Sequence, residues 1–173
     1  MVTCRFVSER EHKAQAPAAV GCYVITVSDT RTEATDASGR AIVELLAGAG
    51  HTVAGRQIVK DEPAQVRAAV ERQLANADVE AIITTGGTGI TSRDTTYEAV
   101  SGLLQKRLDG FGELFRMLSF EQIGSAAMMS RACAGLAAGR IVVCLPGSEK
   151  AVRLAMERLI IPELGHLVQQ ARK

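Results

Sequence analysis

Four short apolar segments alternate along the chain with longer segments that have helical spacing. The apolar segments are residues 23–27, 51–59, 81–84 and 141–145, and each ends in polar residues, glycine or proline. Between them, apolar residues recur at i, i+3, i+4 and i+7, the period of one face of an α-helix. The pattern therefore predicts strands that alternate with helices.

Several helix boundaries are marked by capping and turn residues. Asp36 is placed to cap a helix that carries Ile42, Leu45, Leu46 and Ala49, and Pro63 stands in the first turn of the next helix. Further helices are predicted to begin near Thr95, to cover residues 111–122 and 152–159, and to begin at Pro162. The segment 125–134 could also be helical, with Met128 and Met129 in the core.

The alternation of elements predicts an α/β fold. Continuously apolar strands joined by helices are typical of a parallel, doubly wound sheet with helices on both faces, a single three-layer αβα domain. We assign residues 21–173 to this domain. Residues 1–20 show no sustained period, and we interpret them as an N-terminal arm.

Charge and apolar content exclude several classes of partner. The 173 residues hold 20 Lys plus Arg and 19 Asp plus Glu, a net charge of +1, which is too balanced for nucleic-acid or membrane-surface binding. No apolar run is long enough to span a bilayer, and the N-terminus lacks the apolar stretch of a secretory signal. We therefore expect a cytoplasmic protein.

The four cysteines form no recognisable metal or disulfide pattern. Cys4, Cys22, Cys133 and Cys144 are scattered, without a C-x-x-C pair or a neighbouring histidine. We interpret them as reduced thiols, three of them buried. The sequence around His12, His51 and His166 likewise shows no catalytic or metal-ligand pattern, and we interpret these histidines as surface or structural residues.

The polar and glycine-rich clusters follow the predicted strands. In a parallel sheet the loops after the strands meet at the carboxyl edge, where ligands bind. Loops 28–36, 60–62, 85–94 and 146–149 all belong to that edge. The sequence thus predicts a single site there, and Ser28 and Asp29 lie in its first loop.

Gly86, Gly87, Thr88 and Gly89 are the strongest binding signal in the chain. Such a loop lets backbone N–H groups approach an anion, assisted by the helix N-terminus that follows. No Gly-Lys-Ser/Thr follows, so the loop is not a Walker A motif. The alternative is a tight turn that needs glycine only for positive φ.

Two carboxylates and one turn complete the candidate site. Asp61 and Asp94 each precede a helix and could simply cap it. Their position beside the glycine loop also suits Mg²⁺, which commonly takes one or two carboxylates plus phosphate oxygens. Pro146, Gly147 and Ser148 offer a hydroxyl and helix N-terminal amides, and Lys150 adds a charge for phosphate.

These motifs resemble a known family. Residues 84–89 (Thr-Thr-Gly-Gly-Thr-Gly) with Asp94, together with Pro146-Gly147-Ser148, are similar to the molybdenum cofactor biosynthesis family that includes MoaB, MogA and the G domain of gephyrin. Residues 111–124 and Ser130-Arg131 look most like the MoaB branch. The resemblance covers the chain from Gly21 onward.

The resemblance implies an activity. Family members adenylylate molybdopterin: its terminal phosphate attacks the α-phosphorus of ATP, and pyrophosphate leaves. The family's two functional aspartates match Asp61 and Asp94, which implies Mg²⁺ as the cofactor. Family members are trimers or hexamers, so the resemblance also implies a homotrimer or homohexamer, with other proteins of the pathway as further partners. The aromatic cluster at 111–120 fits either core packing or such an interface.

Two alternatives of another class remain open. A MoaB-type protein could bind the pterin or a partner without catalysis, because the fold alone does not determine activity. CinA-type proteins share the fold and act on pyridine nucleotides, but this chain has no room for their additional C-terminal domain. Neither the choice between the molybdenum and tungsten pathways nor that between trimer and hexamer follows from the sequence.

Overall fold

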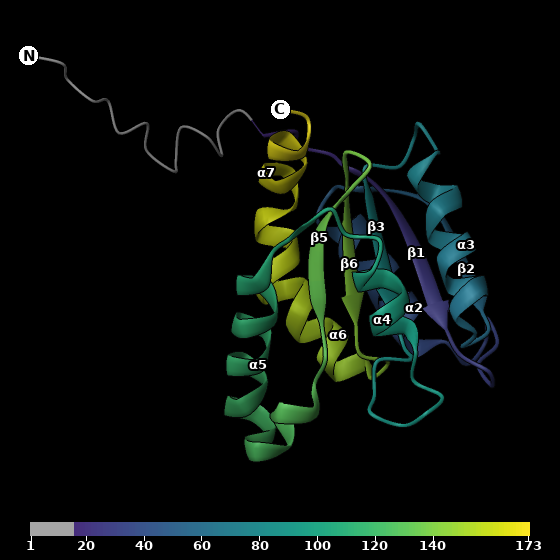
Figure 1. Ribbon diagram of the computed structural model, residues 1–173. Coiled ribbons are helices and arrows are strands. Elements are labelled where there is room, and N and C mark those ends of the chain that lie inside the picture. The colour runs from purple at the N-terminus through teal and green to yellow at the C-terminus, as the bar shows by residue number, and fades with distance from the viewer. Residues whose placement is uncertain (1–15) are drawn as a thin grey trace, which may run out of the picture.

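A six-stranded sheet with the order β2-β1-β3-β6-β5-β4 forms the centre of the protein (Figure 1). The computed structural model describes residues 16–173. The sheet consists of β1 (Gly21–Val27), β2 (Thr52–Val59), β3 (Ala81–Thr85), β4 (Lys106–Arg107), β5 (Cys133–Ala137) and β6 (Arg140–Leu145). The strands β2, β1, β3 and β6 pair in parallel, whereas β5 and β4 add an antiparallel edge. The predicted fold class is confirmed.

Helices cover both faces of the sheet. They are α2 (Ala37–Gly48), α3 (Pro63–Leu74), α4 (Thr96–Ser101), α5 (Asp109–Ile123), the 3₁₀ helix η1 (Gly124–Met129), α6 (Glu149–Ala155), the π-helical turn η2 (Met156–Ile160) and α7 (Ile161–Ala171). One core lies under α2, α5, α6 and α7 and contains Ile42, Phe115, Val152 and Leu164. The opposite core lies under α3 and α4.

Two helix starts follow the sequence signals. The buried carboxylate of Asp36 accepts the backbone N–H of Gly39 at 2.9 Å and the hydroxyl of Thr26 at 2.7 Å, so it caps α2 as predicted. Pro162 lies in the first turn of α7, which continues without a break from the π-helical turn η2.

The segment 125–134 differs from the helical prediction. Residues 124–129 form the 3₁₀ helix, but Cys133 begins strand β5, which turns back through Ala138 and Gly139 into β6. Positive φ angles of 46° and 72° at these two residues make a tight hairpin turn. The residues of β5 are small and lack the β-branched side chains that signal a strand. Met128 and Met129 are 76% and 52% exposed, so their assignment to the core was wrong.

The described end of the predicted arm touches the domain. Val20 is fully buried, and a Cβ on Gly165 of α7 would lie 2.6 Å from the Pro17 carbonyl oxygen. Residues 1–15, with Cys4 and His12, lie outside the described part of the chain. The described cysteines, Cys22, Cys133 and Cys144, are all buried, which confirms the prediction for three thiols. Within residues 16–173, no helix is long and apolar enough to cross a membrane.

Candidate functional site

The candidate site lies beside two neighbouring strands whose following helices pack on opposite faces of the sheet. Strands β1 and β3 are neighbours, but α2 after β1 packs on one face and α4 after β3 packs on the other. In sheets of this kind, the carboxyl ends of two such strands are the usual place for a ligand. The loops after β1, β2, β3 and β6 all reach this edge, as the sequence predicted.

Backbone contacts hold these loops together. The N–H of Gly86 donates to the carbonyl of Leu145 at 3.1 Å, and the hydroxyl of Thr85 donates to the carbonyl of Pro146 at 2.8 Å. A Cβ on Gly147 would lie 3.2 Å from the Cα of Gly86, so the turn after β6 packs directly against the glycine loop. The two predicted binding segments are thus adjacent.

The glycines of the loop are required by both conformation and space. Gly86 and Gly87 have φ angles of +103° and +63°, a region that favours glycine. A Cβ on Gly86 would lie 2.2 Å from the carbonyl oxygen of Val27. On Gly87 it would lie 2.2 Å from Thr96 Oγ1 and 2.5 Å from Asp61 Oδ2. The loop is thus a turn that needs positive φ, and the same turn brings the backbone against the carboxylate of Asp61.

Asp61 is nearly buried at the base of the loop. Its side chain accepts hydroxyl hydrogen bonds from Thr95 at 3.3 Å and Thr96 at 3.4 Å, and only 9% of the residue is exposed. Burial raises the pKa of this carboxyl, and the nearby charges of Asp94 and Asp29 raise it further. Helix α3 is instead preceded by Glu62, so the capping role considered for Asp61 was wrong.

Asp94 lies at the other end of the loop. A Cβ on Gly89 would be 2.5 Å from Asp94 Oδ2, and this oxygen accepts the N–H and the hydroxyl of Thr91 at 3.0 and 2.6 Å. The Thr91 hydroxyl is the main reason that the pKa of Asp94 is lowered. Helix α4 begins at Thr96 after Thr95, without a side-chain cap. The capping role considered as an alternative for Asp94 is therefore wrong.

The two aspartates could hold a divalent cation only together with a ligand. Their charges interact, and their environments shift their pKa values in opposite directions. Among residues 16–173, no group of three or more His, Cys, Asp or Glu side chains could bind a metal alone. Two carboxylates beside this glycine loop nevertheless fit the preference of Mg²⁺ for a few carboxylates plus the oxygens of a bound phosphate.

A charged network joins the first loop to the glycine loop. Arg93 donates to Asp29 Oδ2 at 2.6 Å and to Glu62 Oε1 at 3.1 Å, and Asp29 also accepts the backbone N–H of Asp61. The Arg93 hydrogen bond is the largest cause that lowers the pKa of Asp29. Ser28 accepts from the N–H groups of Thr30 and Arg31 at 3.3 and 3.1 Å, so its hydroxyl shapes the turn.

Arg131 supports the glycine loop. The sequence predicts no role for it in the site, where it counts only toward the family resemblance. Its guanidinium donates to the carbonyls of Thr88 and Gly89 at 2.8 and 2.6 Å, and more weakly to that of Asp94 at 3.4 Å. It also forms an ion pair with Glu98 and lies 4.9 Å from the ring centre of Tyr97. No local pattern reveals this role, because the loop is about forty residues away.

The turn after β6 opens into a separate groove. Ser148 accepts the N–H of Ala151 at 3.3 Å and caps α6, while Lys150 is exposed. The groove has a volume of about 440 Å³ and is lined by Ser148, Lys150, Ser119, Gln122 and Ser130, among others. Lys150 is therefore placed in a groove between α5 and α6, and this groove adjoins the glycine loop through the turn at Pro146 and Gly147.

Comparisons with known proteins agree with the motifs. Residues 23–166 match the family described as "probable molybdopterin binding domain". The molybdenum cofactor biosynthesis protein B of Bacillus anthracis is 55% identical over 162 residues, which are 93% of this chain and 96% of the relative.

Solved structures give the same result. A crystal structure of a molybdenum cofactor biosynthesis protein B has a TM-score of 0.88 at 53% identity and covers 91% of this chain and 99% of its own. The tungsten cofactor synthesizing protein MoaB from Pyrococcus furiosus has a TM-score of 0.81 at 38% identity, with 91% and 100% covered.

Proposed function

This chain belongs to the MoaB/MogA family of molybdenum cofactor biosynthesis proteins, and from that premise we propose that it adenylylates molybdopterin with ATP and Mg²⁺. In the proposed reaction an oxygen of the terminal phosphate of molybdopterin forms a bond to the α-phosphorus of ATP. The bond between that phosphorus and the bridging oxygen breaks, and pyrophosphate leaves. The function in cofactor biosynthesis is supported by the family, and the adenylylation step is our proposal.

One observation carries the proposal: both aspartates touch the glycine loop. The Cβ positions of Gly87 and Gly89 would each lie 2.5 Å from a carboxylate oxygen, of Asp61 and Asp94 respectively. A ligand phosphate that approaches the loop amides therefore also approaches both carboxylates. A divalent cation bound there would compensate the negative charge on the transferring phosphoryl group.

The chain's own residues would act mainly by positioning. A phosphate monoester has a second pKa near 6, so the attacking oxygen is largely ionised at neutral pH and needs no general base. The loop amides of Gly87 and Thr88 would orient the ATP phosphates, because the N–H of Gly86 already donates to the carbonyl of Leu145. Lys150 and the N-terminus of α6 in the adjoining groove would hold the phosphate of the pterin. Positioning and charge compensation of this kind account for most of the catalysis in phosphoryl transfer.

The alternative is a protein that binds molybdopterin without adenylylating it. Incubation of the purified protein with molybdopterin, ATP and Mg²⁺, followed by pyrophosphate release and mass analysis of the pterin, separates the two functions. Catalysis predicts stoichiometric pyrophosphate and adenylylated pterin. Pterin binding in calorimetry without pyrophosphate would replace our proposal with the binding function. Absence of both would reject both.

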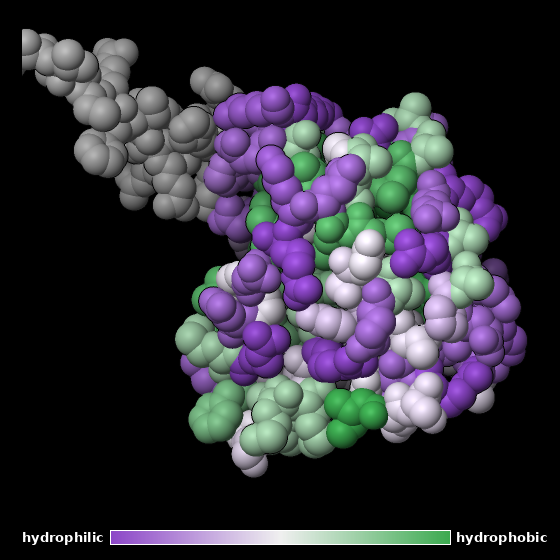
Figure 2. Space-filling model, viewed as in Figure 1, coloured by the Kyte–Doolittle hydropathy of each residue, from purple (hydrophilic) through white to green (hydrophobic). Residues whose placement is uncertain are grey.

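We further propose that the protein assembles as a homotrimer or homohexamer. Large apolar side chains are exposed along α5 and η1: Leu114, Met117, Phe120, Ile123, Met128 and Met129, which are 47–76% exposed. Figure 2 shows hydrophobic residues gathered at this lower end of the molecule. A contiguous patch of this kind is typical of an interaction surface. A second copy of the chain is the occupant that the family resemblance favours.

Light scattering tests this assembly. We expect a trimer or hexamer for the wild type and a smaller species for Phe120→Glu, because a charge would be buried at the interface. Ala47→Glu, at an exposed position of α2, is the matched control and should leave the assembly unchanged. A monodisperse monomer at micromolar concentration would contradict the proposal.

The cytoplasmic location stays a prediction.

A further inference from the structure

Cys133 and Cys144 face one another across two antiparallel strands. They are direct partners in the register of β5 and β6, and each side chain affects the pKa of the other. Directly opposite residues in an antiparallel pair have Cα atoms about 4.5–5.5 Å apart. This spacing lies within the range of about 4.4–6.8 Å that a disulfide bridges. The proposed adenylylation chemistry uses neither thiol.

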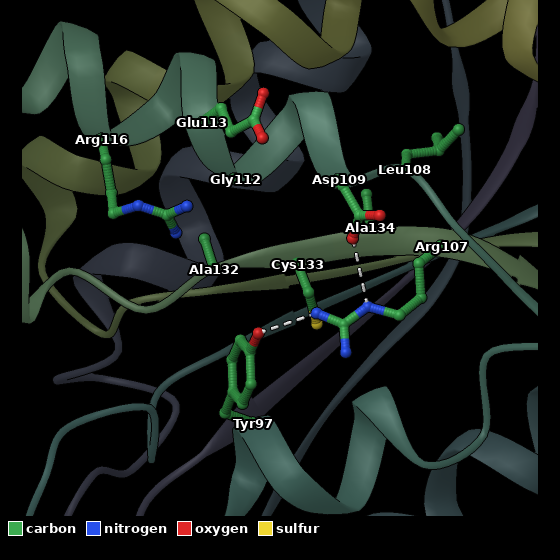
Figure 3. Close-up of a pocket in the computed structure, with 10 residues that line it drawn as sticks. All are labelled: Tyr97, Arg107, Leu108, Asp109, Gly112, Glu113, Arg116, Ala132, Cys133 and Ala134. Carbon is green, nitrogen blue, oxygen red and sulfur yellow. Dashed lines mark hydrogen bonds and ion pairs between the residues drawn. The ribbon is translucent and has the colours of Figure 1, made fainter.

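Both thiols are buried, but Cys133 borders a cavity and is 4% exposed. Cys133 lines a cavity of about 290 Å³ between α4, α5 and β5, together with Tyr97, Arg107, Arg116 and Gly112 (Figure 3). Figure 3 shows the Cys133 sulfur beside the Arg107 guanidinium, which donates to the Tyr97 hydroxyl at 3.1 Å. Cys144 is fully buried behind it. A small neutral molecule can therefore meet Cys133 first.

The surroundings also set the order in which the thiols ionise. The hydrogen bond with Cys144 lowers the pKa of Cys133, as does the positive charge of Arg107, while burial and the charge of Glu98 oppose this. The pKa of Cys144 is raised by its bond to Cys133 and by burial. Since the thiolate is the reactive form, Cys133 is the nucleophile and Cys144 the second thiol.

We propose that Cys133 and Cys144 form a reversible peroxide-sensitive dithiol site. The Cys133 thiolate attacks one oxygen of hydrogen peroxide, the O–O bond breaks, and hydroxide leaves, which gives a sulfenic acid on Cys133. The Cys144 sulfur then attacks the Cys133 sulfur and the S–O bond breaks. The hydroxyl group of the sulfenic acid leaves as water after it takes up the proton of the Cys144 thiol. Overall, two thiols are oxidised to a disulfide and one peroxide is reduced to two waters.

The dithiol site lies on the two strands that lead from Arg131 and toward Pro146. Cys133 lies two residues after Arg131, and Cys144 lies two residues before Pro146. A covalent bond between these strands therefore joins the segments that carry the support of the glycine loop and the turn beside it. The existence of the dithiol site does not depend on the proposed adenylylation.

Peptide mapping after oxidation tests the proposal directly. The full-length reduced protein is treated with a small excess of hydrogen peroxide, blocked with an alkylating reagent during denaturation, and digested with trypsin. Cleavage after Arg131, Arg140 and Lys150 places the two cysteines in separate peptides, 132–140 and 141–150. We expect these peptides to appear joined, with the mass of two hydrogen atoms lost, and to separate on reduction with dithiothreitol.

Cys22 and two variants provide the controls. Cys22, whose pKa burial raises to about 12, should remain a thiol. In Cys144→Ser we expect Cys133 to stop as a sulfenic acid that dimedone traps, and in Cys133→Ser we expect Cys144 to stay reduced. Circular dichroism melts verify that each variant is folded. Failure to find the joined peptides in the folded wild type, or oxidation of Cys22 at the same rate, would overturn the proposal.

Discussion

The guanidinium of Arg131 supports the glycine loop from behind, with Nη2 2.6 Å from the carbonyl oxygen of Gly89 and Nε 2.8 Å from that of Thr88. When these carbonyls accept hydrogen bonds on one side of the loop, the amides of the same peptide chain are held in a fixed orientation on the other. Arg131 is itself fixed by Glu98 and by the ring of Tyr97. It is therefore a positioning residue for the candidate anion site.

Arg131→Lys tests this role. An ammonium group cannot serve both carbonyls and Glu98 in the geometry of a guanidinium. We expect ATP affinity, measured by calorimetry, to fall roughly tenfold, consistent with the loss of one or two charge-assisted hydrogen bonds. Arg67→Lys on α3, which keeps an exposed ion pair with Glu71, is the control. Wild-type affinity in a folded Arg131→Lys protein would show that the loop needs no such support.

Gly87 provides a test of the cradle itself. Gly87→Ala adds a Cβ at a φ of +63°, within 2.5 Å of the Asp61 carboxylate, so the loop must move. We expect weaker binding of ATP or molybdopterin in calorimetry, with Asp61 displaced. Gly48→Ala is the matched control, because nothing lies within 4 Å of its Cβ position and alanine favours a helix. Unchanged affinity for both ligands would mean that the glycine serves the turn alone.

The sequence predicted what depends on local periodicity and on sheet topology. The four parallel strands, the loops at one edge and the closeness of Asp61 to the glycine loop all follow from strand–helix alternation. Strand β4 escaped prediction because it has two residues, and β5 because Cys-Ala-Gly-Leu-Ala carries no strand signature. The capping roles failed because nearby hydroxyls compete for both carboxylates, which spacing alone does not reveal.

The support from Arg131 could not be predicted for a different reason. Arg131 reaches the loop because the hairpin of β5 and β6 returns the chain to the sheet edge, and that hairpin was itself missed. Arg93 is closer in sequence, but its partners Asp29 and Glu62 follow different strands. Contacts of this kind depend on the three-dimensional placement of whole elements, for which a single sequence carries no periodic signal.

Replacement of Asp61 by asparagine should raise the thermal stability of the protein and lower its activity. The pKa of Asp61 is raised in the folded protein, so ionisation at neutral pH is unfavourable for folding; this penalty shrinks as the pH falls through the folded pKa and is gone below the unfolded pKa. We therefore expect Asp61→Asn to melt roughly 1–3 °C above wild type at pH 7. The difference should vanish in acid, where wild-type Asp61 is protonated. Adenylylation should be nearly lost. A variant that melts below wild type at pH 7 would contradict this account.

Asp94→Asn separates the charge of this side chain from its structural contacts. The amide oxygen of asparagine can accept the same two hydrogen bonds from Thr91, so the turn should survive and the melting temperature should hardly change. The negative charge is lost, however, and the pKa of Asp94 is low enough that wild type carries that charge at neutral pH. Removal of one such electrostatic contact typically lowers the rate about a hundredfold.

We expect a folded Asp94→Asn protein that still binds ATP but releases pyrophosphate about a hundredfold more slowly and needs more Mg²⁺ for half-maximal rate. Asp109→Asn is the control, because Asp109 is an exposed carboxylate paired with Arg107 away from the glycine loop, and the rate should be unchanged. The two variants remove the same charge from the protein, so any difference between them reports position. If Asp94→Asn reacts at the wild-type rate with the same Mg²⁺ dependence, Asp94 only orders the Thr91 turn, and the metal-binding role is excluded.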